Sequence, residues 1–150
     1  MSNIQKIVNQ QISQYHTTNI RELLEFHDIE IFYYDSSTKN DSSIFVHNGL
    51  GNIYLKSQLN PLYENFLLAH ELGHYLLHFH QNINFSFTLS CYKNRLEREA
   101  NEFACRFLLS DISIDNDSDI EFIIKEKGIP LTIWYSLYEK IIPDLIKKES

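Results

Sequence analysis

One apolar segment, which contains the motif His70-Glu71-Leu72-Gly73-His74, constrains the fold of this chain more than any other feature. Asn60-Pro61 opens it, and asparagine is a good N-cap while proline suits the first helical position. We therefore predict a helix that begins there and runs to about Phe79. Leucines surround residues 70–74, His-Glu-Leu-Gly-His, so this helix is expected to be buried. Buried polar side chains need partners, and the fold must supply them.

The spacing of these polar residues predicts a metal site. His70 and His74 are four residues apart, which places both imidazoles on one face of a helix. Two imidazoles so placed can bind one zinc ion, and Glu71 between them can take a proton from an activated water molecule. We therefore predict His70 and His74 as ligands, Zn²⁺ as the cofactor and Glu71 as the catalytic base. The alternative is a chance match on a surface helix, but the surrounding leucines favour the metal, because zinc satisfies buried polar groups.

A catalytic zinc site needs a third protein ligand and an open position. His80 has the offset of the metzincin motif, but Leu77 stands where that motif needs a glycine for its turn. His78 shares the helical face of His74 but would lie too far along the axis to complete the site. Gly73 costs about 1 kcal/mol relative to alanine in a helix. It would be tolerated where a strand edge or bound substrate approaches the backbone.

A second predicted helix, residues 95–109, offers two further candidates, Glu97 and Glu99. They lie about 200° apart around the helix, so both cannot face the metal. Glu97 shares one stripe with Asn101 and Ala104, and the small residue in that stripe would let two helices approach closely. This favours Glu97 as the ligand, with Asn101 holding an imidazole by its second nitrogen. Glu99 is expected to be solvated.

The whole chain, residues 1–150, is predicted to be one domain of α+β class. A small N-terminal sheet with helices precedes the active-site helix, which packs against the second ligand-bearing helix. Further helices are expected over residues 4–15, 20–27, 121–125 and 131–142, strands over 29–34, 44–46 and 53–55, and loops over 35–43, 81–93 and 111–119. Asn19 is expected to cap the second helix, and Pro143 to end the last one.

Charge and composition exclude some classes of function. The net charge of -7 opposes binding to nucleic acid, because phosphates must be neutralised by lysine and arginine. No segment approaches the ~20 apolar residues of a membrane span, and the polar N-terminal residues do not form a signal peptide. We therefore expect a cytoplasmic protein, in which Cys91 and Cys105 are reduced thiols.

The segments that carry these residues resemble the ImmA/IrrE family of gluzincin-type metallopeptidases. The resemblance covers residues 51–55, 66–78 and 97–109, about the central third of the chain. It implies that the third ligand is a glutamate on the second helix, which here is Glu97. The chain departs from the family at Ser110-Asp111, where a proline usually follows the leucines.

The resemblance also implies a role in regulation. Proteins of this family often accompany a helix-turn-helix repressor of a phage or mobile element and cleave it, which makes them anti-repressors. The implied partner is therefore a protein substrate, such as a helix-turn-helix transcriptional repressor. The alternative is a non-catalytic module that binds such a repressor through a retained metal-site fold. The intact Glu71 favours the enzyme, since a purely structural site has no use for a base.

Overall fold

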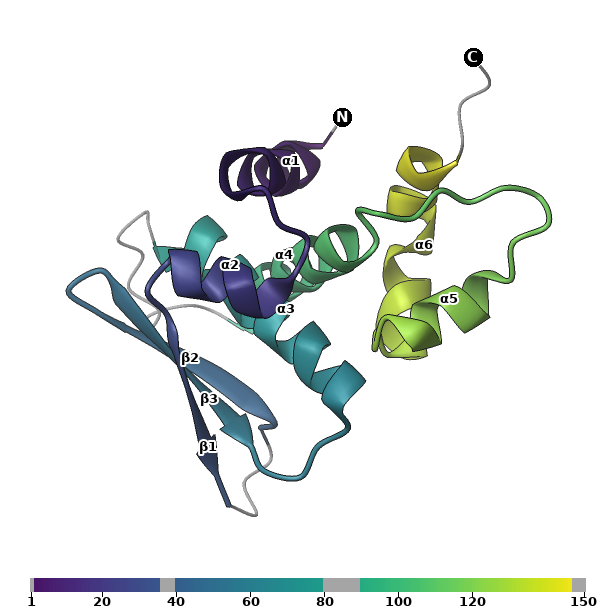
Figure 1. The fold of residues 1–150 in the computed structure, drawn as a ribbon. Helices are drawn as coiled ribbons and strands as arrows, with labels where there is room; N and C mark the ends of the chain where they lie inside the picture. The colour runs from purple at the N-terminus through teal and green to yellow at the C-terminus, as the bar shows by residue number, and fades with distance from the viewer. Residues whose placement is uncertain (1, 36–39, 80–89, 147–150) are drawn as a thin grey trace.

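The computed structural model describes residues 2–35, 40–79 and 90–146. Within them the chain forms six α-helices and a three-stranded sheet, which confirms the predicted α+β class (Figure 1). The elements are α1 (Asn3–Tyr15), α2 (Ile20–Phe26), β1 (Glu30–Tyr34), β2 (Ser42–His47), β3 (Leu50–Lys56), α3 (Pro61–Leu77), α4 (Ser90–Leu108), α5 (Ile120–Glu126) and α6 (Leu131–Leu145). None of the helices in the described ranges is both long and apolar enough to span a membrane.

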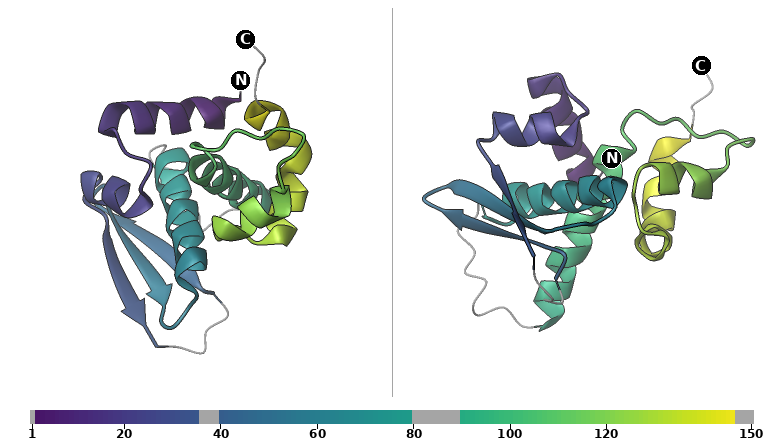
Figure 2. Two further views of the ribbon diagram at one scale, coloured as in Figure 1. Left: turned by 45° about the vertical axis from the view of Figure 1, so that its right-hand side comes forward. Right: turned by 60° about the horizontal axis from the view of Figure 1, so that its bottom comes forward.

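Helix α3 begins as the sequence predicts and forms the centre of the molecule. The Asn60 side chain accepts hydrogen bonds from the backbone N–H groups of Leu62 at 2.8 Å and Tyr63 at 3.4 Å. Residues 66–75 are all buried, and α3 lies between the sheet and the other long helices (Figures 1 and 2). Its apolar side chains therefore carry the two histidines and the glutamate into the interior. The helix ends at Leu77, two residues before the predicted end.

The sheet has the strand order β1-β3-β2, so β2 lies at one edge of it. Strand β1 is parallel to β3, and β2 is antiparallel to β3, with Ser42 opposite Leu55. Strand β2 begins at Ser42 rather than at the predicted Ile44, so the expected loop over residues 35–43 extends too far. Serine has a low preference for strands, but pairing with β3 overrides that preference.

Helix α4 packs directly on α3 at Gly73. A Cβ atom on Gly73 would lie 3.1 Å from Phe103 Cβ and 3.2 Å from Ala100 Cα. This is closer than ordinary van der Waals contact, so the approaching group is α4 and not the strand edge or substrate that the sequence suggested. Helix α4 also begins at Ser90, five residues before the predicted start. Residues 90–94, Ser-Cys-Tyr-Lys-Asn, carry no helical repeat of apolar residues that would reveal this first turn, and residues 81–89 lie outside the described residues.

The last helix corrects another prediction, because α6 continues past Pro143 to Leu145. A proline inside a helix removes one N–H donor and disfavours the helical turn. Here the turn is held by tertiary contacts. Leu145 is buried and its carbonyl accepts a hydrogen bond from Ile114 at 2.9 Å, while Asp144 pairs with Arg106 of α4 at 2.7 Å.

Candidate metal centre

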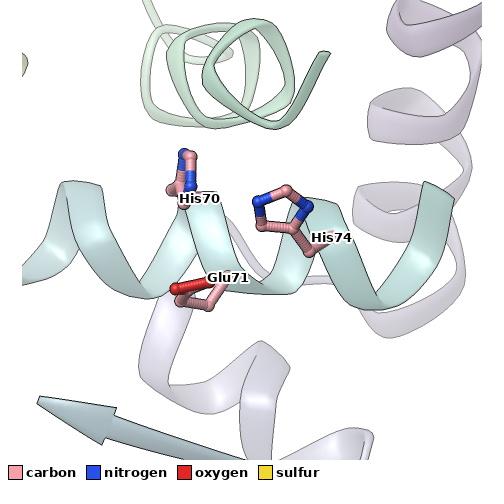
Figure 3. A group of neighbouring side chains, drawn as sticks. All are labelled: His70, Glu71 and His74. Carbon is pink, nitrogen blue, oxygen red and sulfur yellow. The ribbon is translucent and has the colours of Figure 1, made fainter. Parts of the chain in front are cut away.

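Three side chains of α3 come together as the motif spacing requires. His70 and His74 project from the same side of the helix, and Glu71 lies beside them (Figure 3). One donor atom from each of the three lies within 4.8 Å of the others. All three residues are buried. One helical turn therefore gathers two imidazoles and a carboxylate at a single point.

Glu97 of α4 faces both imidazoles. Its Oε2 atom lies 3.1 Å from His70 Nε2, and its Oε1 atom lies 2.9 Å from His74 Nε2. The two Nε2 atoms thus converge on one carboxylate, which is 45% exposed. Imidazole nitrogens and a carboxylate oxygen form a donor set that zinc prefers, and an exposed side leaves room for water or substrate. The residues present therefore fit a zinc ion.

The other nitrogen of each imidazole has its own partner. His70 Nδ1 lies 2.7 Å from Asn101 Oδ1, which can only accept, so His70 donates and its Nε2 faces Glu97. His74 Nδ1 lies 2.9 Å from His78 Nδ1. Such partners fix which nitrogen of a histidine is available to a cation. The structure places Asn101 beside the imidazole as the sequence suggested.

The remaining sequence candidates lie elsewhere or outside the described residues. Glu99 Oε1 is 3.6 Å from both Arg95 Nε and His78 Nε2, so it lies on the His78 side of the cluster. It is therefore placed to form ion pairs and not to share the position of Glu97. His80 lies outside the described residues.

The acidic side chains of the site favour a proton on His70, at the place where a cation would bind. Burial lowers the pKa of His70, but its hydrogen bond with Glu97 and the charges of Glu71 and Glu97 outweigh burial and raise that pKa. For Glu97, burial raises the pKa, but hydrogen bonds from His70 and His74 outweigh it and hold the pKa well below its usual range. Glu97 is thus ionised, and the raised pKa of His70 means that a proton competes with a cation for this imidazole.

Glu71 is held by a residue that the sequence did not reveal. Burial raises the pKa of Glu71, although His70, His74 and the hydroxyl of Ser42 act against it. That hydroxyl donates a hydrogen bond to Glu71 Oε2 at 3.1 Å. A raised pKa makes a carboxylate a better proton acceptor near neutral pH. Ser42 was missed because the sequence predicts residues 35–43 as a loop, and no local pattern links it to α3.

A cavity of about 560 Å³ lies in front of these side chains. Residues 42–44 of β2 and Leu96 and Glu97 of α4 line it. His70, Glu71 and His74 line it as well, so the base and the converging nitrogens share one space. The arrangement can therefore hold a cation and a polar substrate together with a proton acceptor.

Comparison with known proteins assigns the chain to a family. The Peptidase_M78 family model, described as the IrrE N-terminal-like domain, matches residues 24–118, which span β1 to α4 and include the whole site. The chain is 31% identical over 104 residues to the metallopeptidase ImmA of Bacillus subtilis (strain 168), covering 67% of this chain and 59% of that protein. It is 29% identical over 144 residues to the uncharacterized immunity region protein 2 of Bacillus phage phi105, covering 85% and 84%. The predicted resemblance is confirmed, and the chain belongs to the ImmA/IrrE family of metallopeptidases.

Proposed function

We propose that this protein is a zinc-dependent endopeptidase that regulates its target by cleaving it, and that the target is a helix-turn-helix repressor in the cytoplasm. One observation carries the proposal. The Nε2 atoms of His70 and His74 converge on Glu97 beside Glu71, at the edge of an open cavity. Membership of a metallopeptidase family supports a metal-dependent hydrolase at this site.

The residues present divide the chemistry between them. His70, His74 and Glu97 would hold the zinc ion, which when bound supplies a Lewis acid that polarises a carbonyl and acidifies water. Glu71 would take the proton from the attacking water and return it to the leaving amine. The Ser42 hydroxyl donates to Oε2 of Glu71 and would hold this carboxylate in place for the transfer.

The edge strand β2 gives the cavity a means of binding a protein chain. The N–H of Lys56 on β3 donates to the carbonyl of Asp41 at 2.9 Å, so residue 41 belongs to a hydrogen-bonded pair. By antiparallel alternation, the backbone groups of Ser42 and Ile44 point away from β3. An extended peptide can pair with such an edge. It would then cross the cavity beside Glu71, which suits cleavage within a protein.

The nature of the substrate is inferred from the relatives. One of them is a phage protein named for an immunity region, and the family resemblance implies cleavage of a helix-turn-helix repressor. The net charge of -7 fits a protein partner better than the phosphates of DNA. A repressor encoded near this protein is therefore the substrate to test first.

The test is co-expression of the protein with that repressor, followed by detection of the repressor fragments. We expect wild-type protein to cut the repressor and Glu71→Gln to reduce cleavage by roughly 10²–10⁴-fold, the usual contribution of general base catalysis. Glu71→Gln should keep its zinc, because it changes none of the three proposed ligands. Glu64→Gln makes the same change two turns earlier on α3, where Glu64 pairs with Arg21 at 3.0 Å, and should cleave like wild type.

Two outcomes would contradict the proposal. If Glu71→Gln cleaves as fast as wild type, Glu71 is not the base. If wild type and Glu71→Gln both relieve repression while the repressor stays intact, the protein acts as a binding module and not as a peptidase.

A further inference from the structure

The inner nitrogen of His74 faces a second imidazole. His78 lies one helical turn after His74, and the two Nδ1 atoms are 2.9 Å apart. The His78 residue is only 2% exposed, so this contact is shielded from water. Two N–H groups cannot point at each other at this distance, so one nitrogen donates and the other accepts. The hydrogen bond between the two rings therefore runs either from His74 to His78 or from His78 to His74.

Cation binding would fix that direction. Ligation of a cation through His74 Nε2 needs a neutral ring with its proton on Nδ1. His74 Nδ1–H then donates, His78 Nδ1 accepts, and the proton of His78 lies on its own Nε2. That Nε2 atom is 3.6 Å from the carboxylate oxygen Oε1 of Glu99. The negative charge of Glu99 thus lies where it favours the form of His78 that accepts from His74.

The two ligand rings are held by different means. His70 Nδ1 donates to Asn101 Oδ1 at 2.7 Å, and Asn101 belongs to the neighbouring helix α4. His74 instead contacts a ring on its own helix, and Nε2 of that second ring lies 3.6 Å from a carboxylate oxygen of α4, a charge contact and not a hydrogen bond. Each ring therefore has a polar partner behind it and presents Nε2 to Glu97.

We propose that His78 is a positioning residue of the metal centre. It accepts the Nδ1–H of His74, turns the Nε2 atom of that ring toward Glu97 and keeps the ring in the tautomer that binds a cation. Glu99 assists by favouring the accepting form of His78. This inference rests on the metal site of the proposed function and not on its substrate.

The geometry separates this role from direct ligation. The Nδ1 atom of His78 is occupied by His74, and its Nε2 atom faces Glu99. Neither nitrogen of His78 is directed at the place where the Nε2 atoms of His70 and His74 meet Glu97. His78 therefore acts on the cation only through His74.

The test is a zinc titration in competition with a chelator. His78→Leu removes the acceptor and should lower zinc affinity by about 10–100-fold, the usual cost of losing a partner of a ligand. His78→Asn puts an amide oxygen near the place of Nδ1 and should recover most of that loss. Tyr75→Phe is the matched control, because it removes a part-buried hydrogen bond of α3 to the Gly49 carbonyl at 2.8 Å, and should bind zinc like wild type.

A spectroscopic readout distinguishes positioning from general support of the fold. In zinc-loaded wild type, NMR should show a slowly exchanging Nδ1–H on His74, and His78→Leu should lose it. Urea unfolding of the metal-free proteins reports any effect on folding separately. If His78→Leu binds zinc as tightly as wild type and keeps the slow Nδ1–H, the positioning role is wrong.

The same experiments distinguish failure of this inference from failure of the proposed function. If the zinc affinities rank as expected but cleavage does not depend on Glu71, the positioning role stands and the peptidase proposal fails. If cleavage depends on Glu71 but His78→Leu leaves zinc affinity unchanged, the peptidase proposal stands and the positioning role fails. Wild-type protein that takes up no zinc overturns both.

Discussion

Helix α4 places acidic side chains on two of its faces, and the two clusters around them differ in kind. Glu97 faces the imidazoles of His70 and His74 and is 45% exposed. Glu102, about 140° further round the same helix, is 2% exposed and pairs with Arg106 at 2.8 Å. Burial alone would single out Glu102, yet the more exposed carboxylate belongs to the candidate metal centre.

The difference lies in the basic partners and in access to solvent. Arg106 also contacts Gln5 of α1 at 2.8 Å and Asp144 of α6 at 2.7 Å, and Lys140 pairs with Glu102 at 2.9 Å. Arginine keeps its charge in proteins and offers no lone pair, so this cluster can join helices but cannot bind a cation. Imidazoles can release a proton and offer a lone pair beside the cavity. Of the two clusters, the one around Glu97 is therefore the candidate ligand site, because its imidazoles can lose a proton and lie beside the cavity.

The largest expected effect is the loss of zinc binding in Glu97→Ala. Removal of a ligand should lower zinc affinity by more than the 10–100-fold that loss of a ligand's partner costs. The metal-free protein should lose only modest stability, because the carboxylate that Glu97→Ala removes from His70 is half exposed. Glu99→Ala is the matched control on the same helix and should bind zinc far more tightly than Glu97→Ala. The opposite ranking in a chelator competition would show that Glu97 is not the ligand.

The cluster around Glu102 should give the opposite result, a loss of stability without a change in zinc affinity. Arg106→Met leaves Glu102 buried with Lys140 as its remaining cation, and should destabilise the protein by about 3 kcal/mol, the low end for a broken buried ion pair. Zinc affinity of the folded variant should match wild type, because the cluster lies on another face of α4. Urea unfolding and zinc titration measure the two quantities. A change in zinc affinity as large as that of Glu97→Ala would show that the two faces are coupled.

A smaller effect is expected for Asn101→Ala, which removes the acceptor behind His70. The ring would be free to turn and to adopt the other tautomer, so zinc affinity should fall by about 10–100-fold. The variant should still bind one zinc ion per chain in elemental analysis at saturating metal. Unchanged affinity would mean that packing alone holds the His70 ring.

What could be predicted from the sequence follows from short-range periodicity. The spacing of His70 and His74 on one helix, and of Glu97 and Asn101 on another, brings these residues together as soon as the two helices pack. Asn60 caps α3 by contacts within three residues. Each of these inferences uses one helix at a time, so propensity and periodicity were sufficient to make it.

The features that the sequence did not reveal depend on contacts between distant segments. Ser42 reaches Glu71 only because β2 pairs with β3 and thereby lies beside α3. Pro143 stays helical because α4 and residue 114 hold the last turn of α6. His78 has the helical spacing to meet His74, but its role depends on where Glu99 of α4 lies. No local pattern encodes these pairings.

The last expected effect is a pH dependence that only the imidazole cluster should show. Burial lowers the pKa of His70, but the hydrogen bond with Glu97 raises it more, so that pKa lies above the ordinary 6.5. Below the raised value a proton must leave His70 before zinc binds, so affinity should fall by up to about tenfold per pH unit. The hydrogen bonds that lower the pKa of Glu97 against the effect of burial keep it ionised, so it adds nothing to this slope.

Metal-free stability should change in the opposite direction over the same window. A raised folded-state pKa contributes stability that is complete below the unfolded value of 6.5 and is lost as pH rises through the folded value. Above pH 6.5, where the lowered pKa of His78 no longer adds an opposing slope, metal-free protein should therefore become less stable as pH rises, while its zinc affinity increases. Chelator competition and urea unfolding between roughly pH 5.5 and 8.5 bracket this titration. Arg106→Met should keep both slopes, whereas Glu97→Ala should lose the stability slope because His70 no longer has its carboxylate. If the slopes depended on Arg106 instead, the titrating group would belong to the Glu102 face of α4. The two clusters would then not differ in their response to pH.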